Sequence, residues 1–244
     1  KNGGAFGFNT ETGPGPQPPP LESLKKMIPA DKLWPINDEW DFHCGRNEFN
    51  TIKRWLKVFN HRYGEASGVE EFCFNAQVAN YELMRPMYEA FSVKKHNATG
   101  VIGWMLNSAW PEMYWQLYDY YLMPSGAFYG TRNANRPLNI IYDYGDKNIY
   151  LNNDHIDAKE NLTAEIRVVT TAGKTVFEKT FSGQNAVNIG PNRSVKILDM
   201  PKLEHLTTTY FLALKLRNPD GKLIADNFYW LSTKADVMDY PNTI

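Results

Sequence analysis

Residues 6–20, FGFNTETGPGPQPPP, decide the fold of this chain. A short apolar run leads to a single carboxylate, Glu11, and the glycines and prolines beyond it can neither continue a strand nor start a helix before Pro20. This order predicts one acid at the end of a strand. Thr10 and Thr12 flank the acid, and hydroxyl hydrogen bonds to a carboxylate favour the ionised form that a nucleophile requires. The alternative interpretation is that Glu11 is a solvated loop residue. The neighbouring segments have to distinguish this from a nucleophile.

Three helices and a second strand are predicted next. Apolar residues recur at the helical period in residues 21–28, 49–63 and 70–91. Residues 100–107, GVIGWMLN, are nearly all apolar, as in a parallel strand that is buried on both faces. Polar and aromatic residues follow both predicted strands, and (β/α)8 barrels place their active sites at the carboxyl ends of strands. Residues 1–136 therefore have the pattern of βα units from such a barrel.

An aromatic and acidic segment, residues 29–44, separates the first two predicted helices. It is too irregular for a periodic element, and we expect a loop that carries Glu39, Trp40 and His43. Loops of this length in compact domains are usually functional. Core packing is the alternative for Trp40 and His43.

The character of the sequence changes at residue 137. Seven short apolar or alternating runs follow at regular spacing, separated by turn signals, which is the pattern of an immunoglobulin-like β-sandwich. The predicted strands are residues 138–144, 149–151, 162–169, 175–181, 195–198, 208–216 and 223–231. We expect the sandwich to occupy residues 137–234, and residues 235–244 to form a polar tail or linker.

Composition and charge exclude several classes of partner. The 244 residues carry 26 basic and 27 acidic side chains, for a net charge of -1, which offers no electrostatic basis for binding nucleic acid or an acidic membrane surface. No apolar run is long enough to span a bilayer. The histidines and the two cysteines form no ligand cluster, so no metal or cofactor is expected. Cys44 and Cys73 could pair or remain free thiols.

Three segments together resemble one known family. Residues 6–15, FGFNTETGPG, residues 98–138, which include GVIGWMLNSAWPEMYWQLYDYYLMPSGAFYG, and residues 227–236, NFYWLSTKAD, are similar to the C-terminal portion of exo-β-D-glucosaminidases of glycoside hydrolase family 2. The similarity covers most of the chain. Related β-mannosidases share the layout and are the nearest alternative.

The resemblance implies a fold and a set of site residues. In that family a (β/α)8 barrel carries an acid/base glutamate after its fourth strand and a nucleophilic glutamate after its seventh, and Glu11 matches the nucleophile. Residues 1–136 would then be the C-terminal part of a TIM barrel, strands 7 and 8 with their helices. Trp104 would form a wall of the sugar subsite. The remaining expected sugar contacts are Asn107, Trp110, Trp40, His43 and Glu39.

The chain departs from the family pattern in one respect. The first six barrel strands and the acid/base glutamate are expected upstream of these residues, on the same polypeptide or on a second chain. Two strands cannot close a barrel and would leave apolar faces in water. We therefore expect the chain alone to be inactive. The resemblance implies that the complete enzyme removes β-linked glucosamine from the non-reducing end of chitosan oligosaccharides. It also implies a secreted or periplasmic location.

Two other classes of function remain open. In a non-catalytic module, the β-sandwich would bind carbohydrate or brace a barrel, and Glu11 would be incidental. A structural or adhesive protein would account for the sandwich but leaves residues 100–138 unexplained.

Overall fold

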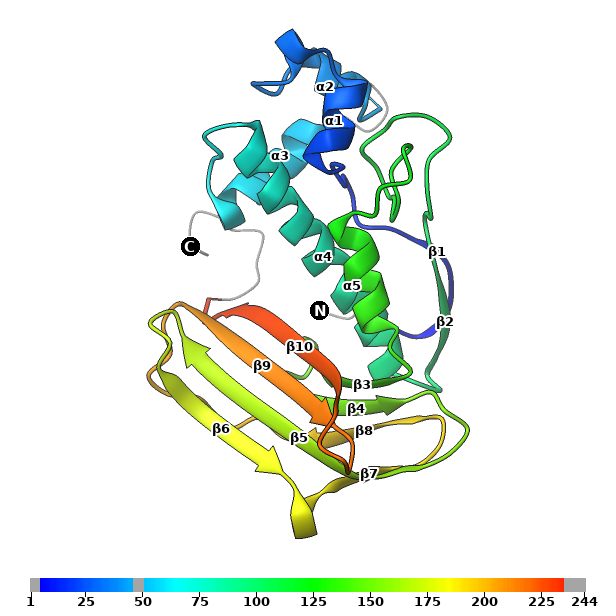
Figure 1. Ribbon diagram of the computed structural model, residues 1–244, viewed down its shortest axis with the longest axis vertical. Coiled ribbons are helices and arrows are strands. Elements are labelled where there is room, and N and C mark those ends of the chain that lie inside the picture. The colour runs from blue at the N-terminus through cyan, green and yellow to red at the C-terminus, as the bar shows by residue number, and fades with distance from the viewer. Residues whose placement is uncertain (1–4, 46–50, 235–244) are drawn as a thin grey trace. The chain divides into compact units, whose positions relative to one another are not determined.

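A computed structural model describes residues 5–45 and 51–234 (Figure 1). The chain divides into two compact units. The helical unit contains residues 9–45, 51–87 and 101–132, and the sandwich unit contains residues 5–8, 88–100 and 133–234. The boundary that we expect between residues 136 and 137 stays a prediction, and the tail at 235–244 lies outside the described residues.

The first part of the chain contains a strand, four helices, a second strand and a fifth helix. In order these are β1 (Gly7–Thr12), α1 (Leu21–Met27), the 3-10 turn η1 (Ala30–Lys32), α2 (Asp38–Phe42), α3 (Thr51–Tyr63), α4 (Val69–Val93), β2 (Ala98–Gly103) and α5 (Gly126–Ala134). Helices α1, α3 and α4 confirm the three that the apolar period predicts. The start predicted at residue 49 lies outside the described residues. None of the described helices is long and apolar enough to cross a bilayer.

The expected loop at residues 29–44 is wrong, because it contains α2 as well as the 3-10 turn. Asn37 caps α2: its side-chain oxygen accepts a hydrogen bond from the backbone N–H of Glu39 at 2.9 Å. Acidic residues fill the first turn, where they complement the helix dipole. A five-residue helix has too few turns to show a period, so the capping pattern was the signal that could have revealed it.

Helix α5 is absent from the sequence prediction because two glycines lower its helix propensity. Tertiary packing explains them. A side chain at Gly126 would overlap the carbonyl oxygen of Gln77, and one at Gly130 would lie 2.6 Å from the carbonyl oxygen of Tyr81. The backbone N–H of Gly126 also donates to Gln77 Oε1 at 2.9 Å. Close approach of α5 to α4 thus requires the glycines.

The core of the helical unit is aromatic and contains both cysteines. Trp40 and Phe72 meet edge to face at 5.4 Å, and Cys44 and Cys73 are buried in the same cluster without a disulfide bond. Burial, with a smaller effect of the Glu70 carboxylate, raises the pKa of Cys73 to about 12, and burial also raises the pKa of Cys44. Both thiols are therefore protonated at neutral pH.

The sandwich unit contains two antiparallel sheets that pack face to face (Figure 1). Its strands are β3 (Leu138–Tyr142), β4 (Ile149–Asn153), β5 (Lys159–Thr170), β6 (Thr175–Phe181), β7 (Val187–Ile189), β8 (Arg193–Leu198), β9 (Thr209–Arg217) and β10 (Leu223–Ser232). One sheet has the order β3-β4-β8, and the other has the order β10-β9-β5-β6 with β7 paired to β5. All seven predicted strands are present. Strand β7 was missed because three residues are too few to show alternation.

The sandwich core follows from alternation along its strands. In β10, Ala225, Asn227, Tyr229 and Leu231 are buried while their neighbours face outward or are less buried. One buried hydroxyl joins three elements: Tyr229 accepts a hydrogen bond from the backbone N–H of Tyr142 at 3.1 Å and donates to Glu89 Oε1 at 2.9 Å. Glu89 lies near the end of α4, whose last turns belong to the sandwich unit.

We expect Tyr229→Phe to lower the free energy of unfolding by about 1–3 kcal/mol, because it keeps the ring but leaves a buried backbone N–H and a buried carboxylate with one partner fewer. Chemical denaturation would measure the change. Tyr150→Phe is the matched control, since its hydroxyl bonds Asp146 at an exposed position and its loss should cost less than about 1 kcal/mol. Equal effects of the two substitutions would contradict a structural role for the Tyr229 hydroxyl.

Candidate active site

Strands β1 and β2 pair in a two-stranded sheet and run parallel (Figure 1). The backbone N–H of Gly7 donates to the carbonyl of Asn97 at 2.7 Å, and that of Trp104 donates to the carbonyl of Thr12 at 2.7 Å. Residue numbers rise together along the two strands, which is the parallel arrangement. The carboxyl ends of both strands therefore lie at the same edge of the sheet.

Glu11 is the next-to-last residue of β1 and is exposed. Its backbone N–H donates to Asn9 Oδ1 at 3.1 Å, which shapes the end of the strand. The acid therefore lies at the carboxyl end of the strand, as the order of residues predicts. Carboxylate bonds from the hydroxyls of Thr10 and Thr12 stay a prediction.

Trp104 directly follows β2, and its backbone is held on several sides. Its N–H bonds Thr12, and the next N–H, that of Met105, bonds the carbonyl of Trp115. A side chain at Gly13 would overlap the carbonyl oxygen of Trp104 and lie 3.0 Å from Trp115 Cδ1. The residue two positions after Glu11 therefore packs directly against Trp104, and only glycine fits there.

The expectation that β2 is buried on both faces is wrong for the described residues. The strand predicted at residues 100–107 ends at Gly103, and Ile102 within it is 51% exposed, while Trp104 and Leu106 beyond it are 46% and 62% exposed. Among those residues β2 has β1 as its strand partner, and two strands cannot cover both of their own faces. Apolar side chains are thus exposed at this pair of strands, and the barrel to which we expect the strands to belong stays a prediction.

The segment after Trp104 carries the next two predicted residues. Asn107 is exposed, and its backbone forms an isolated parallel β-bridge with Tyr118. Trp110 is 39% exposed, and its indole stacks on the imidazole of His43 with ring centroids 5.7 Å apart and an interplanar angle of 22°. The structure thus brings together Glu11 with Trp104, through Thr12, and His43 with Trp110.

Two of the predicted sugar contacts lie inside the protein. Trp40 is wrong as a sugar contact, because it is fully buried and its indole N–H donates to the carbonyl of Leu33 at 3.2 Å. His43 is 6% exposed, and its Nδ1 lies 2.7 Å from the carbonyl oxygen of Pro111. Glu39 lies in the first turn of α2 and is partly exposed, and its contact with sugar stays a prediction.

Other polar residues near this edge organise loops. Ser108 Oγ lies 2.6 Å from Glu112 Oε1 and 2.9 Å from Gln116 Oε1, and the Gln116 amide donates to the Glu112 carbonyl at 2.7 Å. Buried Asp119 accepts hydrogen bonds through Oδ1 from the N–H groups of Tyr121 and Met123. Sequence reasoning missed the Ser108 network, although the spacing of four residues between its members was a usable signal.

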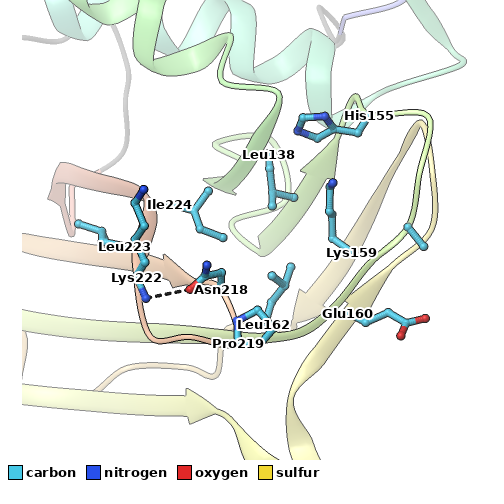
Figure 2. A pocket seen from close by; sticks show the side chains of 11 residues that line it. Leu138, His155, Lys159, Glu160, Leu162, Asn218, Pro219, Lys222, Leu223 and Ile224 are labelled. Atoms are coloured by element: carbon cyan, nitrogen blue, oxygen red, sulfur yellow. Dashed lines mark hydrogen bonds between the residues drawn. The ribbon is translucent and has the colours of Figure 1, made fainter.

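The sandwich unit has a pocket of its own, of about 560 Å³. Figure 2 shows Leu138, Leu162 and Ile224 with polar side chains around them, and Lys159 is held in an ion pair with Asp157 at 2.6 Å. None of the predicted site residues lines this pocket. Across residues 5–45 and 51–234, no group of three histidines, cysteines or acids is placed to bind a metal ion.

Comparison with known proteins finds relatives over nearly the whole chain. Residues 145–234 match the Mannosidase Ig/CBM-like domain family. The exo-beta-D-glucosaminidase of Streptomyces avermitilis is 36% identical over 252 residues, which cover 100% of this chain and 28% of the relative. The crystal structure of the exo-chitosanase CsxA of Amycolatopsis orientalis superposes with a TM-score of 0.89 at 32% identity, over 96% of this chain and 28% of that one.

The chain matches the C-terminal part of exo-β-D-glucosaminidases of glycoside hydrolase family 2. Mannosidases come next: the mannosylglycoprotein endo-beta-mannosidase of Lilium longiflorum is 24% identical over 93% of this chain and 25% of its own length. The resemblance seen in the sequence is thereby confirmed, as is the immunoglobulin-like domain. The chain spans little more than a quarter of the length of these glycoside hydrolase relatives.

We expect Gly13→Ala to displace Trp104 and to lower the free energy of unfolding by about 1–3 kcal/mol, because its new methyl group would meet a backbone carbonyl that cannot rotate away. Gly15→Ala is the matched control in the same segment, since nothing lies within 4 Å of a side chain there. Urea denaturation and tryptophan fluorescence would measure both. Equal stability and equal fluorescence of the two variants would show that Gly13 does not lie so close to the Trp104 carbonyl.

Proposed function

We propose that this chain is part of a retaining glycoside hydrolase in which Glu11 is the nucleophile. The observation that carries the proposal is the parallel pairing of β1 and β2, because it supports Glu11 and Trp104 at one edge of a sheet. Active sites of (β/α)8 barrels occupy that edge. The 30–36% identity to exo-beta-D-glucosaminidases supports the same reaction class.

The barrel is the second part of the proposal. Residues 1–136 would supply strands 7 and 8 with their helices, and an upstream portion of the enzyme, on the same polypeptide or a separate chain, would supply the other strands. Phe8, Ile102 and Leu106 are 58%, 51% and 62% exposed, which supports additional strands. Exposure of such apolar side chains to water is unfavourable, and further strands would bury them. The sandwich at residues 137–234 would brace the barrel.

The reaction would be a double displacement. A Glu11 carboxylate oxygen attacks the anomeric carbon while the bond to the leaving oxygen breaks and an upstream glutamic acid protonates that oxygen. The same upstream carboxylate then takes a proton from water, whose oxygen displaces Glu11 and releases the sugar with retained configuration. The two carboxyl groups must lie about 5–5.5 Å apart, and this chain supplies only one of them. We therefore expect the chain alone to be inactive.

Glucosamine at the non-reducing end of chitosan oligosaccharides is the substrate that we propose. Support comes from the identity to enzymes named for that sugar, over nearly the whole chain. The exposed indoles of Trp104 and Trp110 would cover the apolar face of the pyranose, and Asn107 and Glu39 would bond its hydroxyls. On family resemblance we also propose a secreted or periplasmic location.

A β-mannosidase is the second candidate, favoured by the match of residues 145–234 to a domain family named for mannosidases. The complete enzyme should separate the two when it is assayed on p-nitrophenyl β-D-glucosaminide and on the corresponding β-D-mannoside. We expect faster hydrolysis of the glucosaminide. Faster hydrolysis of the mannoside would show that the substrate is a β-mannoside, and it would not contradict the double-displacement mechanism.

Glu11→Gln should reduce turnover of the complete enzyme by at least about 1,000-fold, because a neutral amide cannot form the glycosyl ester. Thermal unfolding should change little, since the side chain is exposed. Glu22→Gln is the control: Glu22 is exposed on α1 and pairs with Lys25, and its substitution should leave turnover unchanged. Ordinary turnover by Glu11→Gln would refute the nucleophile and favour a non-catalytic module.

A further inference from the structure

Trp110 stands in a loop whose two ends are both fixed. On its N-terminal side, buried Ser108 contacts Glu112 at 2.6 Å and Gln116 at 2.9 Å. The Gln116 amide bonds the carbonyl of Glu112 at 2.7 Å, which fixes the other side of the loop. Trp110 itself remains 39% exposed. A partly exposed indole thus projects from a backbone that is held by buried hydrogen bonds.

His43 fixes the same loop from the end of α2. Its carbonyl accepts a hydrogen bond from the N–H of Met113 at 3.0 Å, and its Nδ1 lies 2.7 Å from the carbonyl of Pro111. A carbonyl oxygen can only accept, so Nδ1 must carry the proton in this bond. One residue therefore bonds the backbone of the loop at two positions that follow Trp110.

The imidazole also supports the indole directly. The two rings stack at 5.7 Å with an angle of 22°, and the phenyl ring of Phe42 meets both of them edge to face at 5.3 and 5.6 Å. His43 is 6% exposed, whereas Trp110 is 39% exposed. The imidazole is therefore the inner member of the stack and the indole is the outer one.

We propose that His43 is a positioning residue that acts through Trp110, holding the indole as a preformed platform for a sugar ring, rather than a residue that bonds the sugar itself. This inference rests on the proposed function. An immobilised aromatic face loses little conformational entropy when a ligand binds, so fixing it in advance strengthens binding. Nδ1 delivers this effect, because it is the atom that bonds Pro111.

Two amide substitutions separate this role from direct contact. The side-chain nitrogen of asparagine occupies the place of Nδ1 in histidine, whereas that of glutamine reaches the place of Nε2. His43→Asn therefore keeps a donor for the carbonyl of Pro111, and His43→Gln keeps one only at the far side of the ring. Both variants lose the aromatic ring, so the cost of losing the stack is common to the pair.

Binding is measured in the complete enzyme that carries Glu11→Gln, by calorimetric titration with p-nitrophenyl β-D-glucosaminide. We expect His43→Asn to bind within about threefold of its parent, and His43→Gln to bind about tenfold more weakly, because the Pro111 carbonyl loses its donor. With Trp110→Ala added to each variant, the difference should disappear, because the platform is gone. In enzyme that retains Glu11, His43→Gln should raise KM more than it lowers kcat.

Several outcomes would overturn the inference. Tighter binding by His43→Gln than by His43→Asn would show that Nε2 contacts the sugar. Equal binding by the two variants, or a difference that persists without the Trp110 indole, would show that the Nδ1 bond does not act through Trp110. Ordinary turnover by Glu11→Gln alone would sink the proposed function instead, so the two failures can be told apart.

Discussion

The backbone contact between the ends of β1 and β2 is the constraint on which the candidate site depends. Thr12 accepts the hydrogen bond of Trp104 at 2.7 Å, and Gly13 lets the Trp104 carbonyl approach more closely than any side chain would allow. Residues about 90 positions apart in sequence are thereby joined at one edge of a parallel pair. Glu11 precedes this contact by one residue, so its position relative to Trp104 is set by backbone geometry, which tolerates less variation than contacts between mobile side chains.

The same principle extends outward from that contact. Buried hydrogen bonds hold the loop around Trp110, as the Ser108 network and the Nδ1 bond of His43 show. Glu11 and Trp104 are exposed at this edge, and Trp110 is exposed in the loop that follows Trp104. The sandwich is built differently: its core is an apolar layer between two antiparallel sheets, with the Tyr229 hydroxyl as a polar link to the end of α4.

The apolar faces of β1 and β2 explain why the proposed enzyme needs more than this chain. A parallel strand is stable when both faces are covered, and here Ile102 and Leu106 are more than half exposed among the described residues. The relatives, of which the chain spans about 28%, are long enough to supply the covering elements. The need for additional strands that we propose for β1 and β2 and the buried core of the sandwich both follow from one rule, that apolar surface is stable when it is buried.

Sequence by itself determined the elements whose patterns repeat: three helices with an apolar period, seven sandwich strands with alternation and turn signals, and the acid at the end of the first strand. It also carried the family resemblance, because residues 98–138 are distinctive as a string. Tertiary structure alone decided what Trp40 and His43 do, since an aromatic side chain in an irregular segment looks the same whether it faces the core or a ligand. It also decided α2, α5 and β7. The approach of α4 to the glycines of α5 and the pairing of β7 with β5 join residues that are far apart in sequence, whereas α2 is too short to show a period and has only its local cap as a signal.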